Sequence, residues 1–522
     1  MTIKRFTLST LILSITFILS ACNMPVGKSS PYPLTQEQLR QTLAAQDNAN
    51  GSNDTVSQTT LTPGNTSPYP AETPSFSNVI TPTGLNYENP GENYYYYARV
   101  GDTLEALSKR FEVEPQQITS QQAIPDTNFI QPGQLLIIPN TLQETLPSEL
   151  LLPDSEVINS PSATDFDIQD YVEKAGGFLS TYQQTVNGET LSGAEIVARV
   201  AAESSVNPRF LLAFLEFRSN WVSGEPNDAR PIDYPIGFRV PDYKGLYYEL
   251  VLTATHLNAG YYGWRSGETT SAKFPDRDKR RLNPTPNAGT IAVQYLFAKF
   301  YHPQRWNEML YGQENFVALY NSMFGDPWQR DAQIGPLFPD GLVQPTLELP
   351  FAPGERWSLT GGPHSSWNTG SPRGALDFAP VTGEPPCSVS KAWVIASAPG
   401  VIVRSDNNVV AIDLDGDGYE QTGWVVVYVH IAEKDQIAPG TIVQTDDRIG
   451  HPSCERGKST GTHVHIARKY NGEWLVAEGP LPFVLSGWVA HAGPRNYQGE
   501  LTKDGKTVYA NPSGKQTSII GR

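Results

Sequence analysis

Histidine is scarce in this chain, and cysteine, methionine and positive charge are scarce too. Its 522 residues include 8 His, 3 Cys and 4 Met, and 38 Lys and Arg against 54 Asp and Glu give a net charge of -16. This acidic balance argues against nucleic-acid binding and against electrostatic attachment to anionic lipid. A charged fraction of only 18%, with 44 Gly and 43 Pro, indicates turn-rich β modules joined by linkers. The length allows about three domains.

Residues 1–22 have the pattern of an export signal. Lys4 and Arg5 precede an apolar run that is too short to span a membrane, and the sequence LSAC ends at Cys22. This ending resembles the lipobox of bacterial lipoproteins, in which the cysteine is lipidated and becomes the mature N-terminus. An ordinary signal peptide with an unrelated cysteine is the alternative. The resemblance implies an exported protein with a lipid anchor in the cell envelope, at the outer face of the cytoplasmic membrane or at the outer membrane.

Residues 23–92 are rich in Ser, Thr and Pro and show no apolar period, which predicts a disordered tether. Residues 93–140 predict a small βααβ unit. A strand at 97–100 precedes a helix with Leu104, Leu107 and Phe111 on one face and Asp102 as its cap. A short second helix at 115–119 and a strand in PGQLLIIP complete the unit.

The segments VGDTL and QPGQLLIIP resemble the two ends of a LysM module. The resemblance implies binding of glycans that contain N-acetylglucosamine, chiefly peptidoglycan. A small α/β domain without a ligand is the alternative. The glycan contacts that the resemblance implies are Gly101, Asp102, Thr103, Ile130 and Pro132.

A second linker is predicted at residues 141–165, and residues 166–340 then predict an all-α domain. Its segment NPRFLLAFLEFRSNW, with Pro208 in the favoured first turn, is similar to the acid-bearing helix of lysozyme-like transglycosylases. In that family a Glu directly precedes the Ser, whereas Arg218 precedes Ser219 here. Arg cannot act as a general acid, and Glu216 would point to another side of the helix. The domain is therefore expected to be lysozyme-like but non-catalytic, and to hold glycan or position the next domain.

Residues 341–522 show short alternating strands separated by turns, which predicts an all-β domain. Six of the eight histidines fall in this region, and a metal site is the simplest explanation for that enrichment. His463 and His465 are two residues apart in a predicted strand, so both project to the same face. Three protein ligands with an open fourth position would make a catalytic zinc site.

The segments GGPH, ALDFAP, VVVYVHIAE and GTHVHIA resemble, in this order, the lysostaphin and β-lytic family of zinc metallopeptidases. The resemblance covers residues 355–480. It implies one Zn²⁺ held by His364, Asp377 and His465, with His430 and His463 as unligated active-site histidines. It also implies hydrolysis of the peptide cross-links of peptidoglycan by a metal-activated water.

One position departs from many members of that family, which place the first histidine ligand where Arg373 stands here. The longer gap after GGPH is similar to the β-lytic branch, and it favours His364 as that ligand. The chain also lacks an HEXXH motif, so a glutamate base is not expected. His463 or His430 should instead accept the proton of the attacking water.

Two further features lie near this site. Cys387 and Cys454 flank it and would pair in an oxidising compartment, with two free thiols as the alternative. The segment DLDGDGYEQTGW begins like a calcium loop with Asp413, Asp415 and Asp417, but Trp424 stands where the bidentate Glu belongs. A polar hairpin tip is therefore the preferred interpretation, and Ca²⁺ is the alternative.

These patterns together predict a zinc-dependent peptidoglycan endopeptidase with a LysM module and a lipid anchor, and no nucleic-acid partner. The oligomeric state stays open. A non-catalytic cell-wall scaffold, or a regulator of other wall hydrolases, is the second hypothesis. The intact histidine and aspartate set argues against that second hypothesis. A third hypothesis, glycan cleavage by the helical domain, conflicts with Arg218.

Overall fold

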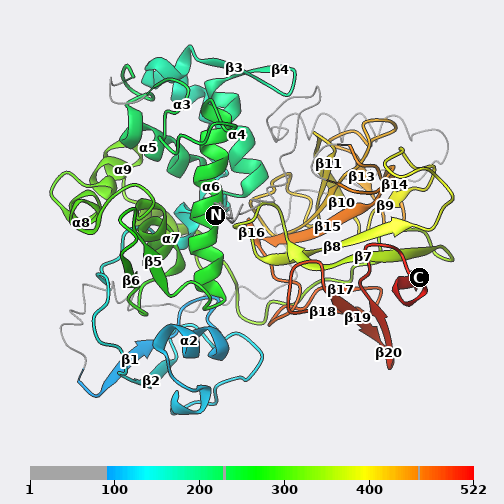
Figure 1. Ribbon diagram of the computed structural model, residues 1–522, viewed down its shortest axis with the longest axis horizontal. Coiled ribbons are helices and arrows are strands. Elements are labelled where there is room, and N and C mark those ends of the chain that lie inside the picture. Colours follow the sequence, from blue (N-terminus) through cyan, green and yellow to red (C-terminus); the bar gives the residue numbers. More distant parts are fainter. Residues whose placement is uncertain (1–90, 227–230, 456–458) are drawn as a thin grey trace, which may run out of the picture.

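The computed structural model describes residues 91–226, 231–455 and 459–522. The predicted signal segment with Cys22, and the predicted tether up to residue 90, lie outside the described residues. Three units are visible in Figure 1: an N-terminal module (residues 91–140), a helical domain, and a β domain that lies beside the helical domain. Within the described residues, no helix is both long and apolar enough to span a membrane.

The N-terminal module has the predicted βααβ order. Strand β1 (Asn93–Tyr97) pairs antiparallel with β2 (Leu135–Pro139), and α2 (Leu104–Phe111) and the 3₁₀ turn η1 (Pro115–Gln117) lie between them in sequence. Two details differ from the prediction. The first strand ends at Tyr97 rather than beginning there, because the chain turns after it toward α2. The helix cap is Thr103, whose hydroxyl accepts a hydrogen bond from Ala106 N at 3.2 Å.

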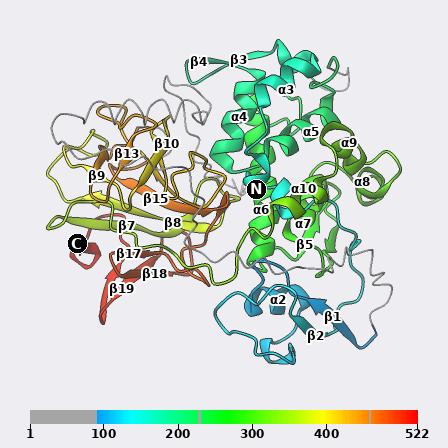
Figure 2. The same cartoon turned by 180° about the vertical axis from the view of Figure 1, so that it is seen from behind.

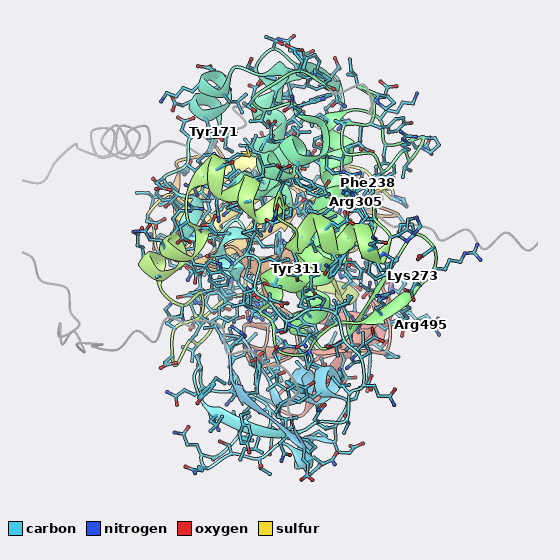
Figure 3. All side chains as sticks on the ribbon, turned by 90° about the vertical axis from the view of Figure 1, so that its left-hand side faces the viewer. Tyr171, Phe238, Lys273, Arg305, Tyr311 and Arg495 are labelled. Carbon is cyan, nitrogen blue, oxygen red and sulfur yellow. A yellow bond between two sulfur atoms is a disulfide. The ribbon has the colours of Figure 1, made fainter. Side chains whose placement is uncertain are left out.

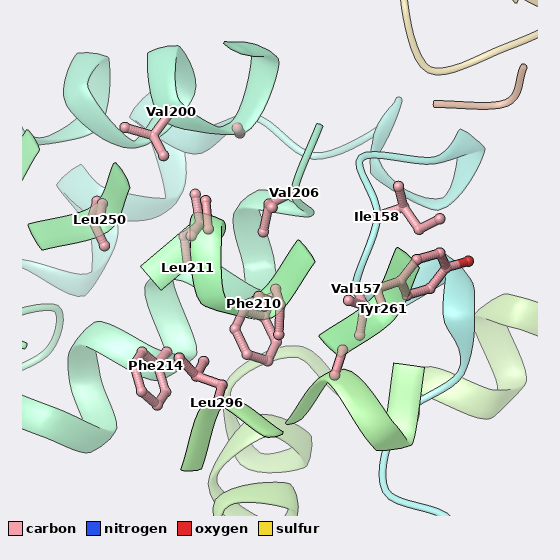
Figure 4. Close-up of a cluster of buried hydrophobic side chains, with 14 of the residues drawn as sticks. Val157, Ile158, Val200, Val206, Phe210, Leu211, Phe214, Leu250, Tyr261 and Leu296 are labelled. Atoms are coloured by element: carbon pink, nitrogen blue, oxygen red, sulfur yellow. The ribbon is translucent and has the colours of Figure 1, made fainter. Parts of the chain in front are cut away.

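The helical domain is built around long buried helices. Figure 4 shows its core, in which Phe210, Leu211 and Phe214 of one helix meet Val200 and Leu250 of two others. The helices are α3 (Ile168–Ala175), α4 (Gly193–Ser204), α5 (Pro208–Ser219), α6 (Leu246–Arg265), α7 (Ala288–Phe297), α8 (Pro303–Tyr311), α9 (Phe316–Phe324) and α10 (Pro327–Ile334). The domain is not purely helical. It also contains the short turn η4 (Phe178–Ser180) and two hairpins, β3 (Gln183–Val186) with β4 (Glu189–Ser192) and β5 (Ser271–Lys273) with β6 (Lys279–Arg281).

The segment predicted as a second linker, residues 141–165, packs against the helical domain instead. Leu151, Leu152, Val157 and Ile158 are buried in the core of that domain. Two 3₁₀ turns, η2 (Asp154–Glu156) and η3 (Pro161–Ala163), shape the segment. The apolar residues lose water contact by folding back, which outweighs the preference of the surrounding Pro and Ser residues for an extended linker.

The β domain contains a nine-stranded sheet within the described residues (Figure 2). Its main path runs β13-β10-β11-β12-β15-β8-β7-β21, and β16 pairs with β15. The strands are β7 (Arg356–Ser365), β8 (Arg373–Pro380), β10 (Gly400–Asp406), β11 (Val409–Asp413), β12 (Trp424–Val429), β13 (Ile442–Val443), β15 (Val464–Tyr470), β16 (Glu473–Trp474) and β21 (Ile519–Gly521). Smaller sheets pair β9 (Val394–Ile395) with β14 (Arg448–Gly450), and join β17 (Val484–Leu485), β18 (Trp488–Ala492), β19 (Gly499–Lys503) and β20 (Lys506–Tyr509). The turn η5 (Gln516–Ser518) precedes β21.

The two faces of the large sheet are buried in different cores. Alternate residues such as Val426 and Ile466 belong to the core of the β domain. Their neighbours Val427 and Ala467, on the opposite face, belong to the same buried cluster as the helices. We call this second face the helix-side face. Because its apolar residues are continuous with the helical core, the helical domain and the β domain share one hydrophobic interior.

Arg265, at the end of α6, links all three units. Its guanidinium Nη2 lies 3.1 Å from Asp154 Oδ2, 3.1 Å from Glu473 Oε2 and 3.0 Å from the Tyr261 hydroxyl. Its Nη1 donates to the backbone carbonyl of Val100 in the N-terminal module. The side chains of Arg265 and Glu473 are only 11% and 5% exposed. This single side chain therefore holds charged and polar groups from the three units in a mostly dry environment.

We predict that Arg265→Met lowers the free energy of unfolding by about 3 kcal/mol or more, because it leaves Glu473 buried without a cation. Urea denaturation of the full chain measures this loss. The control is Arg305→Met on α8, a residue that is labelled in Figure 3. Its side chain is 60% exposed and pairs with Glu308. That change should cost less than about 1 kcal/mol. Equal losses in the two variants would contradict the role given to Arg265.

Candidate metal centre

Cross-strand pairing brings the proposed ligands together. His465 of β15 lies directly opposite Asp377 of β8. Strand β7 pairs with the other edge of β8. Two irregularities in the register between β7 and β8 precede His364, which lies beside Asp377 and His465. All three side chains are buried, with His364, Asp377 and His465 exposed by 2%, 6% and 6%. Segments that are far apart in the sequence thus converge on one point of the helix-side face.

The three ligand atoms form a small triangle. His364 Nε2 lies 3.0 Å from His465 Nδ1, and each of these nitrogens lies 3.3 Å from Asp377 Oδ1. Ligands about 2.0–2.1 Å from a tetrahedral Zn²⁺ are separated by about 3.3–3.4 Å, so the triangle fits one such ion. Asp377 Oδ1 is buried and receives no hydrogen bond from the described part of the chain. A buried carboxylate oxygen without a donor needs a cation beside it.

Charge on Asp377 is favoured by its surroundings. Burial alone would raise the pKa of this carboxyl, but the nearby imidazoles of His364 and His463 lower it well below its ordinary value. The aspartate is therefore ionised at neutral pH and can act as an anionic ligand.

The remaining ring nitrogens of the two histidines are fixed by backbone carbonyls. His364 Nδ1 donates to Gly362 O at 2.8 Å, and His465 Nε2 donates to Ser366 O at 3.0 Å. Because His364 Nδ1 and His465 Nε2 carry the protons, the other ring nitrogens, His364 Nε2 and His465 Nδ1, carry lone pairs. These lone pairs point into the triangle. Metal-binding histidines in proteins are usually oriented by such carbonyl contacts.

His463 and His430 lie beside the triangle rather than in it. His463 Nδ1 donates to Gly461 O at 2.8 Å, while its Nε2 lies 3.8 Å from Asp377 Oδ1. His430 is the residue directly after β12. The centroid of its ring lies 4.5 Å from the ring centroid of His463. Burial lowers the pKa of His430 to about 3, and the neighbouring imidazoles of His463 and His465 act in the same direction. At neutral pH His430 is therefore an uncharged imidazole.

The predicted disulfide is present and supports this site. Cys387 and Cys454 are bonded, with their Cα atoms 4.8 Å apart. Ser453, next to Cys454, pairs with His463 through a β-bridge. The Thr462 hydroxyl donates to Ser388 O at 2.8 Å, close to the other half of the bond. The disulfide therefore ties the loop before His463 to the loop that follows β8.

Tyr497 is a site residue that the sequence analysis missed. Its ring stacks on His364, with centroids 4.2 Å apart and an angle of 23° between the planes. Arg373, which occupies the position of a family ligand, holds the Tyr497 loop: Nη2 donates to Gly493 O at 2.8 Å and Arg495 O at 2.9 Å. No sequence signal marked Tyr497, because it lies beyond the segment that carries the family resemblance.

The glycan contacts predicted in the N-terminal module occupy different environments. Asp102 is buried, and its carboxylate accepts hydrogen bonds from the Tyr96 hydroxyl at 2.6 Å, Arg99 N at 2.7 Å and Arg110 Nη1 at 2.7 Å. Its side chain thus stabilises the module rather than facing a ligand. Thr103 caps α2. The other predicted contacts, Gly101, Ile130 and Pro132, line a cavity.

Other candidate residues have local roles. Glu216 caps the turn after α5 by accepting from Val222 N at 2.7 Å, and Arg218 donates to Ile236 O at 2.9 Å. Neither side chain is placed for acid catalysis by these contacts. Asp413 at the end of β11 and Asp415 and Asp417 in the loop before β12 each place one carboxylate oxygen within 4.8 Å of the other two. The alternative of Ca²⁺ at this loop stays a prediction.

Comparisons with known proteins agree with this organisation. A family described as the LysM domain matches residues 96–139, and a family described as LasA, N-terminal domain, matches residues 150–337. Protease LasA of Pseudomonas aeruginosa (strain PAO1) is 25% identical over 289 residues, which cover 53% of this chain and 65% of that protein. The chain thus spans less than two thirds of the length of this relative.

Two further relatives are beta-lytic metalloendopeptidases. The one from Achromobacter lyticus is 30% identical over 191 residues, which cover 33% of this chain and 47% of that protein. The one from Lysobacter enzymogenes is 27% identical over 185 residues, which cover 33% of this chain and 98% of that protein. Among solved structures, the M23 metalloprotease pseudoalterin is 24% identical with a TM-score of 0.27, covering 32% of this chain and 96% of that one.

These similarities establish the coarse organisation. The chain contains a LysM module, and its helical domain is similar to the LasA N-terminal domain. The predicted likeness of residues 166–340 to lysozyme is not confirmed by these matches and stays a prediction; the matched family begins at residue 150, inside the predicted linker. The similarity to proteases and metalloendopeptidases supports a peptidase-type domain with a metal.

We predict that His465→Ala loses the bound metal, whereas His463→Ala retains about one Zn²⁺ per chain, because only His465 contributes to the triangle. Metal analysis of the two purified variants by mass spectrometry measures this. Equal metal contents would contradict the ligand assignment.

Tyr497→Ala should weaken zinc binding by about 10–100-fold, because the ring that orients His364 is removed. Competition with a chelator measures the affinity. Tyr509→Ala is the control, since Tyr509 is exposed on β20 and Tyr497 is exposed to a similar degree. If both variants bind zinc like the unmodified chain, Tyr497 has no positioning role.

Proposed function

We propose that the β domain is a zinc-dependent endopeptidase that hydrolyses peptide cross-links of peptidoglycan. The observation that carries this proposal is the triangle of His364 Nε2, Asp377 Oδ1 and His465 Nδ1, whose sides are 3.0–3.3 Å. Zinc bound there would polarise a peptide carbonyl and lower the pKa of a coordinated water. The LysM module would hold the wall glycan, and a lipid at Cys22 would anchor the protein to the envelope.

His463 has the geometry of a general base in this proposal. Its Nδ1–H is committed to Gly461 O, so Nε2 carries the lone pair. Nε2 lies on the side of the ring that faces Asp377 and the ligand triangle, within reach of a water there. A histidine in this state can accept a proton from the attacking water and return it to the leaving amine.

His430 would serve as a neutral partner. Its low pKa keeps the ring uncharged at neutral pH, and one ring nitrogen donates its proton to the backbone carbonyl of Glu455. The other ring nitrogen carries a lone pair, so it can accept a proton from a water near the metal. His430 would thus be the alternative to His463 as the base.

The second hypothesis, a scaffold without catalysis, is weaker. A scaffold needs neither a buried carboxylate oxygen without a hydrogen-bond donor nor histidines with oriented lone pairs. Keeping such groups costs stability in a protein that binds no metal. The site therefore favours an enzyme.

We predict that the purified protein releases new amino groups from peptidoglycan and that a chelator abolishes this release. His463→Ala should reduce the rate about 100-fold or more while the metal is retained, because the general base is removed. His491→Ala is the matched control, since this histidine lies on β18 and pairs with Glu478 away from the triangle.

Amino groups are measured by a colorimetric or fluorescent labelling assay, alongside an assay for reducing sugar ends. Release of reducing ends without amino groups would contradict an endopeptidase. Full activity in His463→Ala would contradict the role of His463.

A further inference from the structure

A cavity of about 880 Å³ lies where the LysM module meets the β domain. Three parts of the chain line it: the LysM loops at residues 100–101 and 128–132, a connecting segment at residues 338–347, and part of residues 480–487. Its volume falls within the range of about 300–1,000 Å³ that is typical of ligand pockets. The LysM loops that the family resemblance assigns to glycan are therefore only one wall of a larger space.

The walls of this cavity are fixed relative to one another. Phe129 of the LysM loop stacks on Phe338 of the connecting segment, with ring centroids 5.4 Å apart. Phe338 packs in turn against Leu481. Gln344 Nε2 donates to Val484 O at 2.8 Å, which fastens the connecting segment to β17. Together with the contact between Arg265 and Val100, these interactions hold the LysM module in one place.

The lining has the chemistry of a neutral, amphiphilic binding site. Aromatic, proline and aliphatic side chains alternate with the exposed amides of Asn128 and Gln131. Asp340 is the one charged residue among the described residues that line the cavity, and the lining includes no Lys, Arg or His. Such a surface offers nothing to neutralise a phosphate or a carboxylate. It suits sugar rings, whose apolar faces stack on flat side chains and whose hydroxyl and amide groups bond to amides.

We infer that the cavity holds a stretch of N-acetylated glycan between the LysM module and the β domain, so that both bind one sugar chain jointly. The inference rests on the proposed function only for the choice of a cell-wall glycan as the ligand. It assigns glycan contacts to the connecting segment and to residues 480–487, which lie outside the LysM module.

The cavity and the metal centre use opposite faces of the sheet. Arg468 of β15 donates to Pro482 O at 3.0 Å, so its side chain points toward the segments that line the cavity. His465, three residues earlier on the same strand, points to the helix-side face. Glycan in the cavity therefore does not compete with a peptide at the metal centre.

The test uses a hexamer of β-1,4-linked N-acetylglucosamine, titrated into the full chain by calorimetry. Val343→Glu places a charged, non-stacking side chain in the neutral lining, at a residue that is 73% exposed and therefore tolerates a charge. Ile442→Glu is the matched control, because Ile442 is 48% exposed on β13 and does not line the cavity. We expect Val343→Glu to weaken binding at least tenfold and Ile442→Glu to leave it unchanged.

Equal binding by both variants, or no binding of the hexamer by the unmodified chain, would overturn the inference. Hydrolysis of a sugar-free cross-linked peptide is measured in parallel and should be the same in all three proteins. If the unmodified chain does not cleave the peptide but the hexamer still distinguishes the two variants, the proposed peptidase function fails and the joint glycan site stands.

Discussion

The register between β15 and β8 is the constraint on which the candidate metal centre depends. It places His465 opposite Asp377, and a slip of one residue would turn His463 and His465 to the other face of the sheet together. The apolar residues of β15 protect this register, because Val464 and Ile466 must enter the core of the β domain. The same alternation that buries valine and isoleucine on one face therefore delivers two histidines to the other.

The helix-side face needs a cover, and the helical domain supplies it. Val427 and Ala467 would expose apolar surface to water if the β domain stood alone. Their burial against the helical core joins the two domains into one structural unit, and Arg265 adds the LysM module to it. The position of the LysM module relative to the sheet is thus fixed by packing and by the hydrogen bond from Arg265 to the Val100 carbonyl, not by the length of a linker. The joint glycan site that we propose depends on this fixed position.

Sequence reasoning is strongest where the information is local. Two histidines at i and i+2 share a face of a strand, and the motif around Asp377 marked the neighbouring strand. It failed where distant segments meet. Asp102 was predicted as a helix cap, but Tyr96 and Arg110 draw its carboxylate inward and Thr103 takes the capping position.

The sequence predicts a linker at residues 141–165, but Leu151, Leu152, Val157 and Ile158 are buried in the helical core, through contacts between distant parts of the chain. The contact of Tyr497 with His364 depends on how the β18–β19 hairpin folds over β7, and no local pattern encodes it.

X-ray absorption spectroscopy at the zinc edge of the full chain tests the central claim, a zinc site made by His364, Asp377 and His465, most directly. The account predicts a first shell of nitrogen and oxygen at about 2.0–2.1 Å with the scattering signature of two imidazoles. A shell that contains sulfur at about 2.3 Å, or no histidine at all, would contradict it.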